Sequence, residues 1–142
     1  MPSSTPYAGS RPASVRLDPL PTIAVSVITD ISMVHTVTAL ELPALVASRD
    51  VDLIDVREQH EWDTGHIAGA RLVPLERFRA DPEAALVRGR TTVFICAKGV
   101  RSMAAAKLAE RFGYSDVYNL EGGTKEWARV GLPLAIDERV AA

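Results

Sequence analysis

Short apolar runs alternate with longer segments of helical spacing from about residue 37 onward. The apolar runs have the length of buried strands, and they fall at 51–56, 72–73, 93–95 and 117–120. Helices are expected between them, at 38–48, 75–78, 82–87, 102–112 and 122–130. Strands that alternate with helices predict an α/β fold, with a central parallel sheet and helices on both of its faces.

Polar residues and glycines mark where several of these elements begin and end. Thr38 and Glu41 have the spacing of a capping box at the start of the first helix. Residues 61–70 contain glycines and are expected to form a loop. Because ligands of parallel sheets bind beyond the carboxyl ends of the strands, the residues that follow each strand are the first candidates for a site.

The N-terminal quarter of the chain has a different composition. Residues 1–21 hold five of the nine prolines, with serine and glycine between them, which is typical of a linker or tail. Residues 23–34 fit either a strand or a peripheral helix. We therefore expect a partly disordered N-terminal extension at 1–35, one domain at 36–136 and a short C-terminal tail at 137–142.

Composition narrows the possible partners. The chain has 142 residues and a formal net charge of −2, so nucleic acid and membrane surfaces are not expected partners. It shows no apolar stretch of membrane-spanning length and no secretory signal pattern, and we expect a cytoplasmic protein. The single cysteine, Cys96, cannot form an internal disulfide. None of the three histidines has metal-ligand spacing with it, so neither a metal nor a cofactor is expected.

Cys96 ends an apolar strand and opens a short polar loop that leads into an alanine-rich helix. The positive end of the helix dipole, Lys98 and Arg101 all favour the thiolate, which is the nucleophilic form of cysteine. The alternative is a buried structural cysteine, since free cysteines are often buried. Gly99 and the two cations argue against that alternative, because an apolar core has no use for them. We therefore interpret Cys96 as the reactive centre.

The loop after Cys96 is suited to holding an anion. Its backbone N–H groups can form a nest ahead of the helix, and Gly99 permits the positive φ that such a loop often needs. Arg101 can hold two oxygen atoms of an oxyanion, whereas Lys98 acts as a mobile charge. The substrate-binding candidates in the loop are Ala97, Lys98, Gly99, Val100, Arg101 and Ser102.

Two chemistries fit a thiolate beside a small anion: sulfur transfer through a persulfide, and phosphate or arsenate chemistry through a cysteinyl adduct. Cysteine phosphatases use a C-x5-R loop that holds a tetrahedral phosphate. Here Arg101 lies five positions after Cys96, giving C-x4-R, one residue shorter. The smaller ring favours a single transferred sulfur atom and makes phosphatase or arsenate reductase activity improbable.

Three ordered motifs resemble those of rhodanese-type sulfurtransferases. The active loop is 96–102, the N-terminal motif comprises 53–57 with 61–62 and 65–70, and the C-terminal motif is 119–127. The resemblance covers about residues 36–134. It implies that Cys96 is the catalytic cysteine and that Lys98 and Arg101 bind the substrate. Asp55 and Arg57 match positions near the mouth of the family's pocket, and a structural ion pair is an alternative role for them.

The resemblance implies a sulfurtransferase in which Cys96 takes a sulfane sulfur from thiosulfate or a related donor and passes it to a thiophilic acceptor. The expected partners are a small anionic sulfur donor and an acceptor that is a thiol, cyanide or a protein. The main alternative is a sulfur-relay module that passes persulfide sulfur to a partner protein in cofactor or tRNA thiolation. His66, Trp62 and Trp127 are expected to have structural roles.

Overall fold

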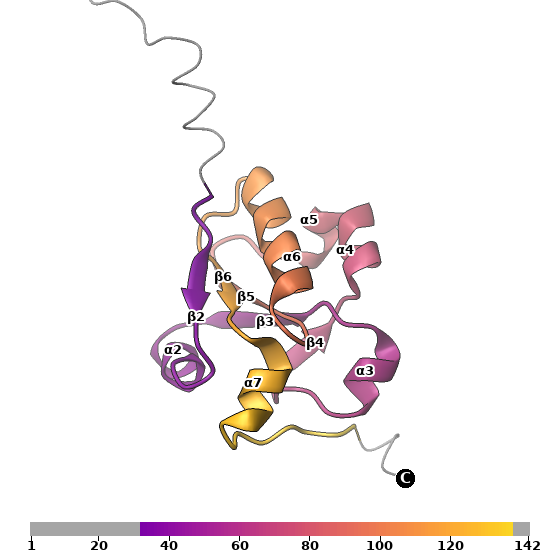
Figure 1. Ribbon diagram of the computed structural model, residues 1–142. Coiled ribbons are helices and arrows are strands. Elements are labelled where there is room, and N and C mark those ends of the chain that lie inside the picture. Colours follow the sequence, from indigo (N-terminus) through magenta and orange to yellow (C-terminus); the bar gives the residue numbers. More distant parts are fainter. Residues whose placement is uncertain (1–31, 138–142) are drawn as a thin grey trace, which may run out of the picture. The chain divides into compact units, whose positions relative to one another are not determined.

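The computed structural model describes residues 32–137, which contain five strands and six helices (Figure 1). Most of the predicted N-terminal extension, residues 1–31, and most of the predicted tail, residues 138–142, lie outside the described residues. None of the helices in the described range has the length and apolar character needed to cross a bilayer.

All strands of the described region belong to one parallel sheet. They are β2 (His35–Val37), β3 (Val51–Asp55), β4 (Ala70–Leu72), β5 (Thr91–Ile95) and β6 (Val117–Leu120). Their order in the sheet is β2-β6-β5-β3-β4, with every neighbouring pair parallel. The predicted α/β fold with a central parallel sheet is confirmed, and β5, which leads to Cys96, lies in the middle of the sheet.

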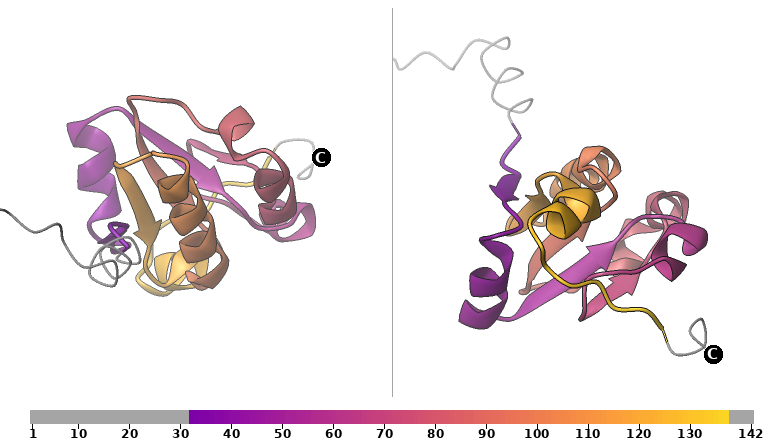
Figure 2. Two further views of the ribbon diagram at one scale, coloured as in Figure 1. Left: turned by 90° about the horizontal axis from the view of Figure 1, so that it is seen from above. Right: turned by 60° about the horizontal axis from the view of Figure 1, so that its bottom comes forward.

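The helices cover both faces of the sheet (Figure 2). They are α2 (Leu42–Ser48), α3 (Gln59–Asp63), α4 (Leu75–Ala80), α5 (Pro82–Ala85), α6 (Val100–Arg111) and α7 (Gly123–Arg129). Side chains of α4 and α6 pack in one buried cluster against the sheet, and side chains of α2 and α7 pack in a second one on the other face.

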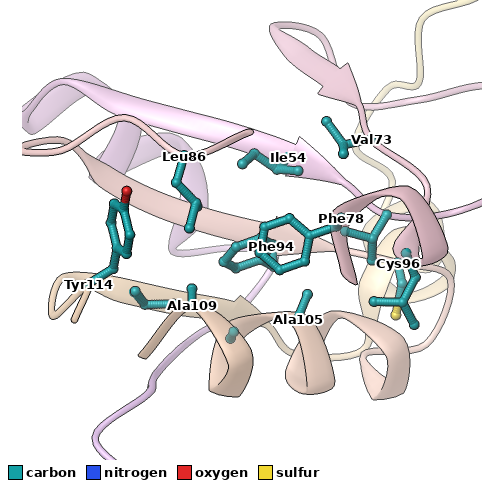
Figure 3. Close-up of a cluster of buried hydrophobic side chains, with 13 residues drawn as sticks. Ile54, Val73, Phe78, Leu86, Phe94, Cys96, Ala105, Ala109 and Tyr114 are labelled. Carbon is teal, nitrogen blue, oxygen red and sulfur yellow. The ribbon is translucent and has the colours of Figure 1, made fainter. Parts of the chain in front are cut away.

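Alternating side chains of β5 supply both clusters. Phe94 and Cys96 point into the cluster beneath α4 and α6 (Figure 3). There the ring of Phe94 packs edge to face on that of Phe78, with ring centroids 5.2 Å apart. Val93 and Ile95 point into the cluster beneath α2 and α7. Because both faces of this strand are buried, its last three residues, 93–95, are all apolar rather than alternating with polar ones.

Several element boundaries differ from the sequence-based expectation. The prediction of a loop over 61–70 is wrong at its start, because α3 covers Gln59–Asp63. Glu58 and Glu61 form a capping box that begins this helix. Helix α6 begins at Val100 rather than Ser102, since Gly99 adopts φ 98° as its N-cap. The predicted reciprocal bonds between Thr38 and Glu41 are both present, although α2 itself begins at Leu42.

Candidate active site

The carboxyl ends of β3, β5 and β6 meet at one edge of the sheet and bring the three sequence motifs together. The N–H of Val56, just after β3, donates to the carbonyl of Ile95 at 2.8 Å. Cys96 therefore leaves β5 directly beside the end of β3, and Asn119 on β6 contacts the loop from the other side. This is the edge at which ligands of parallel sheets bind.

The Cys96 thiol lies inside the loop and is surrounded by hydrogen-bond donors. The backbone N–H of Gly99 donates to Sγ at 3.0 Å, and the N–H of Ser102 does so at 3.3 Å. The Ser102 hydroxyl lies 3.1 Å from the same sulfur. Only 1% of Cys96 is exposed. The loop thus forms a nest around the sulfur at the N-terminus of α6.

These contacts change the acidity of the thiol. Burial on its own raises the pKa of Cys96, but hydrogen bonds from the Ser102 hydroxyl and from the N–H groups of Ser102, Lys98 and Gly99 outweigh it. The pKa of Cys96 is consequently lowered from its ordinary value. A buried structural cysteine in an apolar pocket would have the opposite shift, so the geometry favours a reactive thiolate.

Asn119 contacts the loop at two points, a role that the sequence analysis did not assign to it. Its Nδ2 donates to the carbonyl of Gly99 at 3.2 Å, and its Oδ1 accepts a hydrogen bond from the Ser102 hydroxyl. The sequence places Asn119 in the C-terminal motif, but its contact with the loop depends on the pairing of β5 with β6.

Gly123 lets α7 approach the active loop closely. The N–H of Thr124 donates to the carbonyl of Cys96 at 2.9 Å, and the N–H of Lys125 donates to that of Ala97 at 3.0 Å. A Cβ at Gly123 would lie 2.3 Å from the Cys96 carbonyl oxygen. The glycine at this position is therefore required by the close approach of two backbones.

Arg101 is engaged by a residue from α3. Its Nη1 and Nη2 donate to the two carboxylate oxygens of Glu61, each at 2.8 Å. The hydrogen bond from Arg101 holds the pKa of Glu61 at about 2. To hold a substrate oxyanion in the bidentate manner expected from the sequence, the guanidinium would have to leave this carboxylate.

The other loop positions differ in exposure. Lys98 is exposed, and its side chain makes no hydrogen bond or ion pair with any residue in the range 32–137. Val100 is 75% exposed at the start of α6. Ala97 lines a cavity of about 360 Å³ together with His60, Thr64 and Lys125. A small anion entering beside Ala97 would thus meet the positive charge of Lys125, which lines the same cavity.

Asp55 and Arg57 form a buried ion pair close to the cavity. The Nη2 of Arg57 donates to Asp55 at 2.8 Å and to the carbonyl of Gly65 at 2.9 Å, and Nη1 donates to the carbonyl of Glu61 at 3.3 Å. Asp55 is fully buried, and 5% of the Arg57 side chain is exposed. These contacts anchor the segment around α3 to the end of β3, which favours the structural alternative for the pair.

The aromatic residues of the motifs have packing contacts. Trp62 stacks on His66 with ring centroids 3.6 Å apart, and its Nε1 donates to Asp137 at 2.9 Å. Trp127 donates to the carbonyl of Pro133 at 2.8 Å. Within the described part of the chain, no group of three or more His, Cys, Asp or Glu side chains could hold a metal ion.

The geometry agrees with what comparison of the sequence finds. A family model for the rhodanese-like domain matches residues 38–130. The chain belongs to the rhodanese-like family. It is 28% identical to a rhodanese-related protein from Thermoplasma volcanium, whose crystal structure superposes with a TM-score of 0.66, covering 72% of this chain and 99% of that one.

Two curated relatives are larger proteins. A probable adenylyltransferase/sulfurtransferase, MoeZ from Mycobacterium tuberculosis, is 41% identical over 96 residues, covering 66% of this chain and 24% of MoeZ. A tRNA uridine(34) hydroxylase from Pectobacterium atrosepticum is 32% identical over 100 residues, covering 64% of this chain and 28% of the hydroxylase. The chain therefore spans about a quarter of the length of these relatives, and they differ in activity.

Proposed function

We propose that this protein is a sulfurtransferase that carries a sulfane sulfur on Cys96, taken from thiosulfate or a related anionic donor and given to a thiophilic acceptor. The observation that supports this most directly is the loop around Sγ, in which the N–H groups of Gly99 and Ser102 donate to the sulfur. Such a nest stabilises a thiolate before the reaction and the charged outer sulfur of a persulfide afterwards. The similarity to MoeZ, a probable sulfurtransferase, points the same way.

Transfer takes place in two displacement steps. The Cys96 thiolate attacks the outer sulfur of thiosulfate, the sulfur–sulfur bond of the donor breaks, and sulfite leaves with the electron pair. The resulting persulfide is then attacked at its outer sulfur by the acceptor, and Cys96 leaves as the thiolate. No second cysteine in the chain can take up the sulfur, so the acceptor comes from outside, and we expect ping-pong kinetics.

The remaining site residues have supporting roles in this proposal. Lys98, which is exposed and unpaired in the described region, attracts the anionic donor. Arg101 braces the loop through Glu61, and the buried Asp55–Arg57 pair holds the neighbouring segment in place. Backbone amides from Ala97 to Ser102 surround the transferred sulfur.

We also propose a cytoplasmic location, where a reducing environment keeps a lone reactive thiol available.

Mass spectrometry of the intact protein tests the proposal. Thiosulfate should add one sulfur atom, about 32 Da, as the covalent intermediate of nucleophilic catalysis, and cyanide should remove it. Cys96→Ser should neither gain mass nor turn over thiosulfate. A wild-type protein that gains no sulfur, or a Cys96→Ser variant with native turnover, would overturn the proposed function.

A groove on α6 favours a protein acceptor as a second candidate function. The groove has a volume of about 560 Å³, starts at the exposed Val100 and continues along Met103, Lys107 and Arg111. Its lining contains no acidic residue, and neither Lys107 nor Arg111 forms an ion pair within residues 32–137. The groove therefore suits an acidic segment of an acceptor protein that brings its own thiol to the buried Cys96.

Two cysteine-terminated peptides separate this candidate from simple sulfur transfer. A glutamate-rich peptide should discharge the Cys96 persulfide faster than its glutamine counterpart, and salt should reduce the difference. The double variant Lys107→Glu, Arg111→Glu should abolish the preference and leave loading by thiosulfate unchanged. Equal rates with both peptides, or a preference that survives charge reversal, would contradict a docking role for the groove.

A further inference from the structure

Asn119, Ser102 and Cys96 form a buried chain of polar contacts from β6 to the reactive sulfur. All three residues are at most 5% exposed. Because Nδ2 of Asn119 donates to the Gly99 carbonyl, Oδ1 faces Ser102 and accepts the hydrogen bond from its hydroxyl. The same hydroxyl oxygen lies 3.1 Å from Sγ of Cys96. Ser102 thus stands between an amide oxygen and a sulfur atom.

The single hydroxyl hydrogen of Ser102 cannot serve both neighbours at once. While it is donated to Asn119, Oγ can only accept, which suits a protonated thiol that donates its own hydrogen. A thiolate has no hydrogen, and it would then face the lone pairs of Oγ. Hence the hydrogen has to turn from Asn119 to Sγ when the sulfur of Cys96 becomes negatively charged.

We infer that Asn119 is a positioning residue that holds the Ser102 hydroxyl as a movable donor. The Ser102 hydroxyl donates its hydrogen bond to Asn119 while Sγ of Cys96 is uncharged. It donates to Sγ instead when the thiolate forms. This inference rests on the proposed function, since it assigns a role within the persulfide cycle. It is distinct from the role of the backbone N–H groups, whose direction is fixed by the loop.

The hydrogen bond from the Ser102 hydroxyl to Sγ should accelerate discharge of the persulfide. In the persulfide the charge lies on the outer sulfur, and Sγ is uncharged. When the acceptor attacks the outer sulfur, the sulfur–sulfur bond breaks and its electron pair moves to Sγ. The hydrogen bond from Ser102 to Sγ therefore forms as charge develops, which lowers the barrier for this step. In the loading step the thiolate is the reactant, so the same bond gives no acceleration.

Asn119 contributes by holding Oγ of Ser102 in place, 3.1 Å from Sγ. Without Oδ1 as an acceptor, the Ser102 side chain would be free to rotate away from the sulfur. The hydrogen bond to Sγ would then have to be organised during the reaction, and discharge would be slower. The role of Asn119 should consequently depend on the presence of the Ser102 hydroxyl.

Single-turnover measurements of the two half-reactions test the inference. Ser102→Ala should slow persulfide discharge to cyanide or dithiothreitol by about ten- to a hundredfold, the range for a hydrogen bond to a charged group. Loading by thiosulfate, measured at a pH where Cys96 is ionised, should not be slowed to a comparable extent. Ser102→Thr retains a hydroxyl and should restore discharge, whereas Ser48→Ala, an exposed serine on α2, should change neither step. Equal slowing of both steps by Ser102→Ala would overturn the inference.

A double-mutant cycle isolates Asn119. Asn119→Leu should slow discharge when Ser102 is present, and its effect should be at least about fivefold smaller in the Ser102→Ala background. If Asn119→Leu does not fold, Asn119→Asp carries the same test, because its carboxylate retains the hydroxyl hydrogen. The same effect in both backgrounds would show that Asn119 only anchors Gly99. A protein that loads and discharges sulfur without this coupling overturns the inference alone, whereas one that never loads sulfur overturns the proposed function.

Discussion

Arg101 and Glu61, separated by 40 positions in the sequence, form a bidentate ion pair with two contacts of 2.8 Å. The same Glu61 carboxylate accepts the N–H of Glu58 at 2.9 Å and so completes the capping box of α3. One carboxylate therefore joins the start of α3 to the first turn of α6, immediately after the active loop. The pair holds α3 beside the first turn of α6 and neutralises the charge of Arg101, one of the two loop cations.

The pair should make stability depend on pH. Its guanidinium holds the pKa of Glu61 at about 2, below the ordinary value of 4.5. A lowered folded-state pKa gives a contribution that is complete above the unfolded-state value and is lost as the pH falls from about 4.5 toward about 2. Solvent screens this partly exposed pair, so we expect about 1 kcal/mol.

Urea unfolding of Glu61→Gln measures this contribution. The variant should be less stable than wild type at pH 7, and the difference should shrink as the pH is lowered through that window. Glu76→Gln, which breaks the exposed pair with Arg79 on α4, is the matched control and should change stability by less than about 0.5 kcal/mol. A Glu61→Gln difference that is independent of pH would contradict the assignment.

Donor binding should depend more on Lys98 than on Arg101. Lys98→Ala should raise KM for thiosulfate about two- to fivefold, the range for an exposed charge, and salt should have a similar effect on wild type. Arg101→Ala should change KM by less than about twofold, because Glu61 already balances its charge. Lys107→Ala, on the outer side of α6, is the control. A larger KM effect from Arg101→Ala than from Lys98→Ala would restore the bidentate role expected from the sequence.

Gly123 should be the glycine least able to accept a side chain. A Cβ there would overlap the Cys96 carbonyl at 2.3 Å and the Ala97 carbonyl at 2.5 Å, both of them backbone groups that cannot rotate away. Gly131 also has a positive φ, but nothing lies within 4 Å of the point that a Cβ would occupy there. Gly123→Ala should therefore cost more stability than Gly131→Ala and should also reduce sulfur loading. Similar thermal stabilities of the two variants would show that the backbone of α7 is not in tight contact with the loop.

The sequence was most informative where the determining residues are neighbours in the chain. The run before Cys96 is apolar because both faces of β5 are buried, and the loop after it is read directly from adjacent residues. The capping box of Glu58 and Glu61 was equally local, but the glycines that follow it favoured a loop, and α3 was missed.

The partners of the site residues could not be read in the same way. Glu61 reaches Arg101 only because α3 packs beside the active loop, and Asn119 reaches Ser102 only because β6 pairs with β5. A bidentate arginine looks the same in sequence whether its partner is a substrate or a carboxylate of the protein itself. The fold was thus predictable, whereas the contacts that surround Cys96 required the tertiary structure.

The acidity of Cys96 provides the last prediction. Its pKa is lowered from 9.0 because hydrogen bonds to the sulfur outweigh the opposing effect of burial. Only the thiolate reacts with iodoacetamide, so the alkylation rate should rise with pH and reach half its maximum below pH 9.0. Cys96 is the sole cysteine in the chain, so the measurement reports one site, and Cys96→Ser supplies the background. A half-maximum at or above pH 9.0 would mean that burial prevails over the loop amides. The nest would then hold a neutral thiol, and the attack on thiosulfate would need a base that the loop does not supply.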